Sequence, residues 1–514
     1  MSWNPSTSCR TPNPSKTPTP QLQPPPKSPS PRSIHRSIEA KQPTKSIEMA
    51  SSSTSPAPPP PWVILGRIAR VRHDHDAAAP LSVALAKRPR VSTLTVPTSL
   101  HPAPTRDGAD RYPYVVAADD HAGLLLLHVS ASPEVGFHLR RHPPGVLLVA
   151  GRDFLPPAAA AGSRDAATCA AVARLPARDQ PGQVGIHNLK NVGLVSAPGS
   201  GGAEYMVVEL RVVKEPDRTT LHCFRSGAAA WEEKVLLSPP MARRHKWSSS
   251  DDVISLDGRL WWVDLVWGVV GCDPFADRPV LTYVSFSDSN ARPKHIETRR
   301  MVRVSQGEVR FVELSGGGAA ADLGATQVVV STLFVSPDSL AVGWWRKQCS
   351  TSLELLWASD SYRKTGMPEE LPVPALLHPN NANLVYFFLR QHLFGVNVDE
   401  GEVVNFVNAP YDLVQVAAGD AGPVRPPPIS WRYVLAWVLP HSLANAYAEL
   451  DSKDNQDGKE KNGTAQDDQD VAPPPSAGKR KMPATVGDQS PSARTRKRPD
   501  TQRSPDATDT SSSE

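Results

Sequence analysis

Histidine and aspartate side chains stand together at His73–Asp76, which reads HDHD and follows the first apolar run of the chain. Histidine nitrogens and carboxylate oxygens are common zinc ligands, and residues two apart in a strand share a face. The spacing supplies no further ligands nearby. A polar turn after the first strand is therefore favoured over a metal site, and no metal is predicted.

Three aspartates, Asp264, Asp273 and Asp277, lie in the best-patterned region of the chain. Paired carboxylates can perform general acid–base catalysis or bind a cation. Asp273 precedes a proline, however, which is typical of a turn in which the carboxylate caps backbone amides. Asp264 follows a strand and is expected to face solvent or to bond a neighbouring amide. Structural roles are favoured for all three.

The remaining candidate motifs do not assemble a catalytic site. The glycine-rich segments 199–202 and 316–318 are followed by neither a helical pattern nor a Lys-Ser/Thr pair, so neither is a phosphate loop. The chain contains no G-x-S-x-G, H-E-x-x-H or protein-kinase motif. His222 and Cys223 are adjacent in an expected strand and point apart. No catalytic residue and no cofactor is predicted, and the protein is expected not to be an enzyme.

Two basic clusters near the C-terminus are separated by twelve residues and resemble a bipartite nuclear localisation signal. They comprise Lys479, Arg480, Lys481, Arg494, Arg496, Lys497 and Arg498. The alternative is a solvated tail of mixed charge, since residues 451–470 are rich in aspartate. Nucleic-acid binding is disfavoured because no aromatic residues are interleaved with the cations. A nuclear import receptor is thus an expected partner, and the nucleus is favoured over the cytoplasm or an organelle.

Ser490 precedes a proline between the two basic clusters and is a candidate phosphorylation site. A phosphate there would add negative charge beside the import signal. The substitution Ser490→Asp is therefore predicted to weaken nuclear entry of a fluorescent fusion. Unchanged localisation would refute this prediction.

Composition divides the 514-residue chain into a folded part and two tails. Its 54 prolines gather at the two ends, where a packed core would not tolerate them. Residues 1–48 hold seven Lys or Arg against two Glu, so they alone exceed the formal net charge of +4. The second methionine, Met49, begins a segment that looks like an ordinary start of translation. A protein that started there would lack the excess positive charge of residues 1–48.

The cysteines indicate a cellular compartment, and the hydropathy of the chain argues against a membrane span. The cysteines are odd in number, widely spaced and without a C-x-x-C pair, which predicts reduced thiols in an intracellular compartment. They are Cys9, Cys169, Cys223, Cys272 and Cys349. No run of apolar residues is long enough for a transmembrane helix, and the N-terminus lacks the apolar stretch of a secretory signal. An organelle transit peptide is disfavoured by the prolines.

Short apolar runs bounded by turn residues predict β-strands through most of the folded part. The clearest block, residues 251–286, contains Asp257-Gly258, a strong signal for a type I′ hairpin turn. The adjacent Trp261 and Trp262 should point to opposite faces, one into the core and the other toward a surface or rim. Gln306-Gly307 and Glu400-Gly401 mark further turns, SLELLWAS is grouped with the strands, and PHSLANAYAEL is read as a short helix.

Strand–turn–strand units recur loosely, which favours an all-β, propeller-like fold of repeated antiparallel sheets flanked by disordered tails. The predicted boundaries are a Pro/Ser-rich segment at 1–60, the all-β domain at 61–449 with its most characteristic part at 188–413, and a charged tail at 450–514.

The block LDGRLWWVDLVWGVVGCDPFADRPVLTYVSF, the upstream NVGLVSAPGSGGAEYMVVEL and the later LLWASDSYRKTGMPEELPVPALLHPNNANLVYFFLRQHLFGVNV together resemble a plant family, the domain of unknown function 1618, expanded in cereal grasses. The family has no established activity, catalytic residues or cofactor. The resemblance implies a distant similarity to the propeller-like domains associated with F-box proteins, which present surfaces to partners. No F-box helix pattern precedes the strands here.

These observations together predict a non-enzymatic protein-interaction module of the kelch or F-box-associated propeller type, located in the nucleus. Its protein partners are unknown, and no membrane partner is expected. Two alternatives remain: an enzyme with an Asp/His site in a propeller pocket, and a nucleic-acid-associated protein acting through its basic tail.

Overall fold

The computed structural model describes residues 60–72, 81–101, 112–119, 121–129, 146–151, 154–155, 166–169, 172–176, 186–213, 218–236, 249–286, 295–316, 323–336, 339–408 and 431–448. Residues 1–59 of the predicted N-terminal tail, the whole predicted C-terminal tail with the nuclear localisation signal and Ser490, and the His73–Asp76 cluster lie outside these residues. Among the described residues, no helix is long and apolar enough to cross a membrane.

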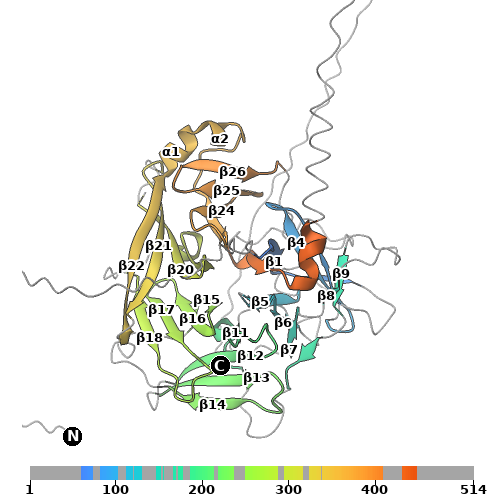
Figure 1. The fold of residues 1–514 in the computed structure, drawn as a ribbon. Helices are drawn as coiled ribbons and strands as arrows, with labels where there is room; N and C mark the ends of the chain where they lie inside the picture. The colour runs from blue at the N-terminus through green and yellow to red at the C-terminus, as the bar shows by residue number, and fades with distance from the viewer. Residues whose placement is uncertain are drawn as a thin grey trace, which may run out of the picture. The chain divides into compact units, whose positions relative to one another are not determined.

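Most of the described chain forms five four-stranded antiparallel sheets, each built from strands in sequence order and termed blades (Figure 1). The first comprises β5 (Tyr114–Ala118), β6 (Leu125–Val129), β7 (Val146–Ala150) and β10 (Ala173–Arg174). The second comprises β11 (Val192–Ser196), β12 (Tyr205–Val213), β13 (Arg218–Arg225) and β14 (Glu232–Val235). The third comprises β15 (Asp252–Leu256), β16 (Arg259–Asp264), β17 (Gly268–Cys272) and β18 (Thr282–Ser285).

The last two blades follow the same plan. The fourth comprises β19 (Arg300–Ser305), β20 (Glu308–Ser315), β21 (Gln327–Ser336) and β22 (Ser339–Ser352). The fifth comprises β23 (Val373–Leu377), β24 (Leu384–Leu389), β25 (His392–Asn397) and β26 (Glu402–Phe406). The predicted propeller arrangement of repeated antiparallel sheets is confirmed, and residues 251–286 form one whole blade.

A seven-stranded sheet, termed the closing sheet, joins the two ends of the described chain. Its strands are β27 (Val434–Val438), β1 (Trp62–Gly66), β4 (Val91–Pro97), β3 (Leu81–Ala84), β9 (Ala166–Cys169), β8 (Phe154–Leu155) and β2 (Arg70–Arg72). β27 pairs antiparallel with β1 over five residue pairs, from Trp62 with Val438 to Gly66 with Val434. β3 and β4 lie between residues 76 and 110, where the sequence pattern is weak and rich in alanine, proline and threonine.

Contacts between first strands close the sheets into a ring. β5, β11, β15, β19, β23 and β27 contact one another in that order, and a bridge from Ile68 to Tyr114 returns the ring to β5. Each hydrophobic cluster accordingly lies between neighbouring sheets: one holds Val208 of the second blade with Trp262 of the third, and another holds Trp62 of the closing sheet with Tyr386 of the fifth blade.

This two-sided packing corrects the expectation for the tryptophan pair. Trp261 and Trp262 do point to opposite faces, but both are core residues, 5% and 0% exposed. Trp261 packs toward the fourth blade and Trp262 toward the second. The indole N–H of Trp262 donates to the Asn191 carbonyl at 2.7 Å. A blade between two other blades has no solvent face, so an alternating strand buries both sets of side chains.

The turns predicted from Asp-Gly and Gln-Gly pairs are confirmed by their backbone angles. Asp257 and Gly258 have φ of 49° and 76° between β15 and β16, and Gln306 and Gly307 have φ of 53° and 68° between β19 and β20. Positive φ at both central positions matches the twist of a tight hairpin.

The strand expected at SLELLWAS is wrong, because this segment forms α1 (Leu353–Ala358), followed by α2 (Asp360–Arg363). The Ser352 hydroxyl accepts a bond from the Leu355 N–H at 3.2 Å, which is an N-cap. Leu353 and Leu356, three residues apart, bury on one side of this helix. Residues 441–448 are helical, as predicted. Short 3₁₀ turns occur at Leu189–Asn191, Ile296–Thr298 and Trp431–Tyr433.

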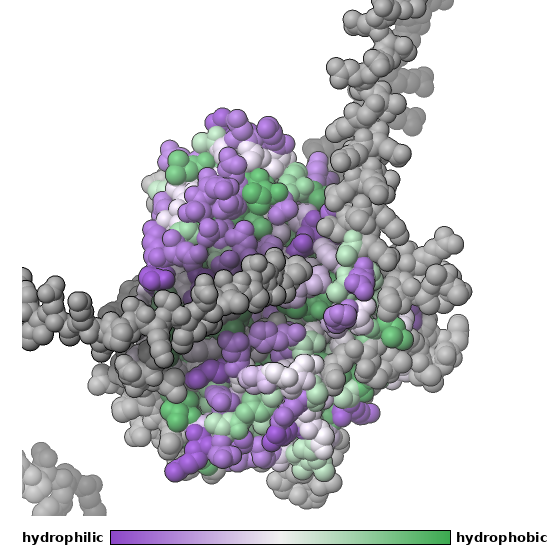
Figure 2. All heavy atoms as spheres, in the orientation of Figure 1, coloured by the Kyte–Doolittle hydropathy of each residue, from purple (hydrophilic) through white to green (hydrophobic). Residues whose placement is uncertain are grey.

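Large apolar side chains reach solvent at scattered places rather than in one patch. Those of the described residues that are exposed are Leu155, Val235, Val280, Trp344, Leu355 and Val404. On the face drawn in Figure 2, hydrophilic residues predominate over the fifth blade and hydrophobic residues form small separate areas.

Candidate functional site: a central cavity with a charged floor

A cavity of about 410 Å³ lies where the first strands of the ring converge. Its walls come from β5, β15, β19, β23 and β27, and its rim from the turns that follow these strands and from Pro60. The apolar wall residues are Ala117, Ala118, Val253, Ile254, Leu256, Val304, Leu377, Leu435, Ala436 and Val438. This volume and this mixture of walls are typical of small-molecule sites.

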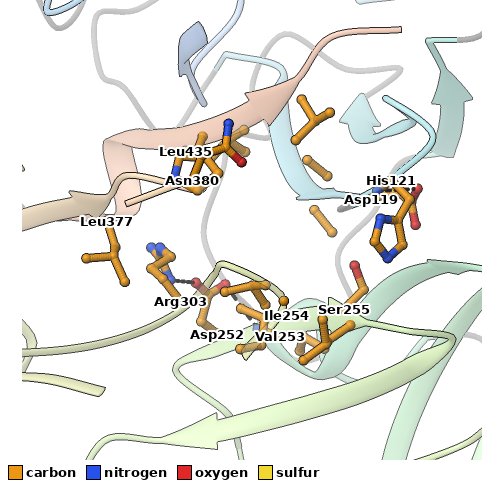
Figure 3. Close-up of a pocket in the computed structure, with 18 of the residues that line it drawn as sticks. Asp119, His121, Asp252, Val253, Ile254, Ser255, Arg303, Leu377, Asn380 and Leu435 are labelled. Atoms are coloured by element: carbon orange, nitrogen blue, oxygen red, sulfur yellow. Dashed lines mark hydrogen bonds and ion pairs between the residues drawn. The ribbon is translucent and has the colours of Figure 1, made fainter. Parts of the chain in front are cut away.

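Three charged side chains line one side of the cavity and are termed the floor cluster: Arg67, Asp252 and Arg303. Figure 3 shows Asp252 and Arg303 paired there. Asp252 Oδ2 accepts from Arg303 Nη1 at 2.6 Å, and Asp252 Oδ1 lies 3.4 Å from Arg67 Nη2. Arg67 also donates to the carbonyls of Val115 and Val116, at 3.1 and 2.7 Å. The floor cluster therefore ties the closing sheet to the first, third and fourth blades.

The floor cluster is almost wholly buried, and it holds two positive charges against one negative charge. Burial by itself would raise the pKa of Asp252, but the guanidinium groups of Arg67 and Arg303 outweigh it and lower that pKa. Burial lowers the pKa of Arg303, with Asp252 opposing the shift. Asp252 is thus ionised at neutral pH and cannot act there as a proton donor.

A second, much smaller cavity of about 20 Å³ lies on the far side of the floor cluster, because Arg67 and Asp252 line both spaces. There Arg432 pairs with Asp251 at 3.0 Å, and the Tyr114 hydroxyl donates to the Arg432 carbonyl at 2.8 Å. Arg67 and Asp252 therefore lie between the larger cavity and the smaller one.

Asp119 and His121 lie across the cavity from Arg303 (Figure 3). Asp119 is buried, and its carboxylate accepts from the backbone N–H groups of His121, Ala122 and Ser196 at 3.2, 2.6 and 3.0 Å. This carboxylate therefore fixes the turn after β5 and links it to the second blade. His121 is exposed at the rim, where its Nε2 lies 3.2 Å from Asp257 Oδ1.

His378 stands beside the rim and is held neutral by its surroundings. Its Nδ1 accepts the backbone N–H of Asn380 at 3.0 Å, so this nitrogen carries no proton. Burial first, and then the charge of Arg88, lower the pKa of His378 to about 4. The ring also meets Trp62 edge-on, with centroids 4.7 Å apart.

This neutral histidine predicts a pH dependence of stability. Between the ordinary pKa of about 6.5 and the folded value near 4, the unfolded chain binds a proton that the folded chain does not. The stabilisation is complete above pH 6.5 and is lost as pH falls toward 4, by about 2 kcal/mol after allowance for partial solvent exposure.

Urea unfolding of the wild type and of His378→Gln between pH 4 and 7 measures this effect. We expect the wild-type stability to fall more steeply with acid than that of the variant, because glutamine does not titrate. His121→Gln, at the exposed rim, is the matched control and should follow the wild type. Parallel curves for the wild type and His378→Gln would contradict the prediction.

The sequence-predicted carboxylates have structural roles where their contacts are seen. Asp264 Oδ1 accepts from the Val266 and Trp267 N–H groups at 2.9 and 3.3 Å, and Asp273 Oδ1 from the Phe275 N–H at 2.8 Å. Asp264, Asp273 and Asp277 do not line the central cavity. Within the described ranges, no group of three or more His, Cys, Asp or Glu residues is placed to hold a metal.

His222 and Cys223 point to opposite faces, as predicted for neighbours in a strand. His222 stacks on Trp231 with ring centroids 4.9 Å apart, whereas Cys223 lies in the cluster between the second and third blades. Cys169, Cys223, Cys272 and Cys349 are buried free thiols, and Cys9 lies outside the described residues. Burial raises the pKa of both Cys223 and Cys272 to about 12, which makes them poor nucleophiles at neutral pH.

Sequence reasoning missed the floor cluster entirely, because its members lie far apart in the chain. Asp252 and Arg67 are 185 residues apart, and Asp252 and Arg303 are 51 apart. The only local signal was an arginine inside the apolar run MVRVS, where a charged residue must find a buried partner or leave the core.

Among known proteins, one family model matches the region around the third and fourth blades. A family model described as "Protein of unknown function (DUF1618)" matches residues 262–386. The predicted family resemblance is confirmed over this segment. The DUF1618 match runs from β16 to β24 and includes Arg303 of the floor cluster, whereas Arg67 and Asp252 lie outside it. No curated protein matches the chain at a significant level.

Two solved structures show the level of structural likeness. The β-propeller domain of Myceliophteria thermophila Cps50 (Swd1) is 10% identical, with a TM-score of 0.29, over 60% of this chain and 88% of that chain. The α-L-arabinofuranosidase Arb93A of Fusarium graminearum is 10% identical, with a TM-score of 0.30, over 60% and 85%. At these scores neither likeness carries a functional argument, and the propeller arrangement rests on the strand pairing of this chain.

Proposed function

We propose that the protein is a non-enzymatic interaction module that binds a partner protein through an exposed aromatic surface of its fourth blade. The observation that carries this proposal is Trp344 on β22, whose side chain is 51% exposed. It stacks on Phe334 of β21, with ring centroids 5.8 Å apart. Arg346, two residues on, places its guanidinium 4.1 Å from the centre of the Phe334 ring. We term these three residues the aromatic platform.

The aromatic platform has the composition of a binding hot spot. Tryptophan and arginine are the residues most enriched among those that dominate protein–protein affinity. The neighbouring Trp345 faces the other way and packs near Phe286 and Phe311, with centroids 5.4 and 5.5 Å apart. This inward anchor holds β22 so that Trp344 is presented at low entropic cost.

The central cavity supports the non-enzymatic part of the proposal. A carboxylate that acts as a catalytic acid or base needs an oxygen that is free to reach the substrate. Both oxygens of Asp119 are committed to backbone N–H groups, and both oxygens of Asp252 face arginines. The alternative of an Asp/His enzyme site is thus less well supported, although Asp119 and His121 do meet in the cavity.

Affinity purification with the fragment from Met49 to Leu450 tests the aromatic platform. We expect the wild-type fragment to retain a reproducible partner that Trp344→Ser loses by at least tenfold, while Val235→Ser, an exposed apolar residue of another blade, retains it. A single hot-spot tryptophan contributes about 2 kcal/mol or more, which exceeds a tenfold change in affinity. Identical partner sets for the two variants would overturn the proposal for this surface.

The nuclear location is a separate part of the proposal and rests on the basic clusters at 479–481 and 494–498. A fluorescent fusion that begins at Met49 and runs to Glu514 is compared with one that ends at Leu450. We expect the longer fusion to enter the nucleus and the shorter one to lose this preference. If both remain cytoplasmic, the clusters are solvated tail and the nuclear assignment is withdrawn.

A further inference from the structure

The floor cluster contains buried hydrogen-bond donors that its own members do not satisfy. Arg303 uses Nη1 for Asp252 and for the Val302 carbonyl, at 2.6 and 2.8 Å. Its Nε and Nη2 have no hydrogen-bond partner among the described residues, although the side chain is only 10% exposed. An unsatisfied buried donor costs free energy, and a charged donor costs more than a neutral one, so such a group calls for an explanation.

The charges around the cavity are also unevenly distributed. Arg67 and Arg303 carry two positive charges, and Asp252 offsets one of them. Asp119, the other carboxylate of the lining, lies across the cavity and is compensated by three backbone N–H groups. The floor beside Arg303 therefore favours an anionic group over a neutral or cationic one.

The walls above Arg303 are apolar. Ile254, Leu377 and Leu435 face the space above the floor, and the volume of about 410 Å³ is sufficient for a small organic molecule. Figure 3 shows Arg303 between Leu377 and Asp252, at the side of the cavity where these walls meet the floor. A ligand that fits this surface has an apolar body and one anionic end.

We propose that the central cavity binds a small amphipathic organic anion whose charged group pairs with Arg303. Arg303 lines the cavity, its Nε and Nη2 donors are buried, and its guanidinium lies 4.9 Å from the centre of the Trp431 ring. On binding, the guanidinium turns so that both donors reach a carboxylate or sulfonate, in the bidentate geometry that arginine favours. The apolar body then contacts Ile254, Leu377 and Leu435.

Two fluorescent probes of similar shape test the proposal on the full-length protein. 8-Anilinonaphthalene-1-sulfonate carries the anionic group, and N-phenyl-1-naphthylamine lacks it. We expect saturable binding of the sulfonate at one site per chain, at least tenfold tighter than binding of the neutral probe. Added salt should weaken binding of the sulfonate and leave the neutral probe unaffected.

Variants separate the charged floor from the apolar walls. Arg303→Met should reduce sulfonate affinity at least tenfold and leave the neutral probe unaffected, because Asp252 keeps Arg67 as its partner. Leu377→Trp, which narrows the cavity, should weaken binding of both probes. Arg278→Met, the same change at an exposed position outside the cavity lining, is the matched control and should bind as the wild type does.

Several results would overturn the proposal. Equal sulfonate affinity for the wild type and Arg303→Met would show that Arg303 holds no anion. Unchanged binding of both probes to Leu377→Trp would place them outside the cavity. Far-ultraviolet circular dichroism of each variant must match the wild type, and if Arg303→Met fails this check, Arg303→Lys, which keeps the charge but not the bidentate donors, gives the same comparison. Fluorescence that rises without saturation would also count against a defined site.

Discussion

Replacing Asp252 by asparagine should destabilise the protein by about 3–5 kcal/mol. The change removes the only carboxylate of the floor cluster and leaves the Arg67 and Arg303 guanidinium groups buried together without a counter-charge. Removing one partner of a buried ion pair costs far more than a hydrogen bond, because the remaining charge keeps its full desolvation penalty. Chemical denaturation followed by tryptophan fluorescence measures the loss.

Two control variants test whether the loss of stability comes from the missing charge of Asp252 or from any substitution near the centre of the ring. Asp257→Asn makes the same chemical change at an exposed turn with positive φ, which asparagine tolerates, and should alter stability by less than about 0.5 kcal/mol. Arg303→Met leaves Asp252 and Arg67 as a balanced pair and should cost far less than Asp252→Asn. An Asp252→Asn protein as stable as the wild type would show that the floor cluster contributes no net electrostatic stabilisation.

The pH dependence follows from the lowered pKa of Asp252. A carboxyl with a folded pKa below its unfolded value of about 3.9 stabilises the folded state fully above that pH. The contribution is lost as pH falls from there through the folded pKa. The difference between the wild type and Asp252→Asn should therefore be constant near neutrality and should shrink below pH 4.

Local sequence patterns predicted the blades well because the information that specifies them is itself local. The hairpin at Asp257-Gly258 needs positive φ at two adjacent residues, and the alternation in RLWWVD needs only a regular strand. The segment at SLELLWAS, predicted as a strand, also carries local helix signals: Ser352 caps the first turn, and Leu353 and Leu356 bury at helical spacing.

The candidate sites could not be predicted in the same way, because burial on both faces and long-range pairing decide them. Trp262 was not predictable as core rather than rim until the second blade was known to cover it. Arg303 appears in the sequence as one more cation, and its role depends on Asp252 from a different blade. Trp344 and Trp345 show the same limit. They are adjacent residues of one type, and only the fold shows that Trp344 is exposed while Trp345 packs inward.

Closure of the ring by β27 predicts a second large effect. β27 supplies the only pairing that joins the C-terminal part of the described chain to β1. Trp437 is fully buried in the cluster between the closing sheet and the first blade, and its indole N–H donates to the Gly123 carbonyl at 2.9 Å. Leu443 and Tyr447, from the helix that follows, bury in the same cluster.

A chain that ends at Ser430 should therefore fail to fold cooperatively, whereas one that ends at Leu450 should unfold like the full-length protein. Each large side chain lost from β27 and its helix removes about 1.5–3 kcal/mol of burial, and several together exceed the roughly 5–15 kcal/mol that stabilise a whole domain. Thermal unfolding by circular dichroism compares the two. Trp437→Ala, expected to cost about 3–5 kcal/mol, tests the same contact without exposing the edge of β1. A sharp, unshifted transition in the chain ending at Ser430 would mean that the five blades are stable without closure.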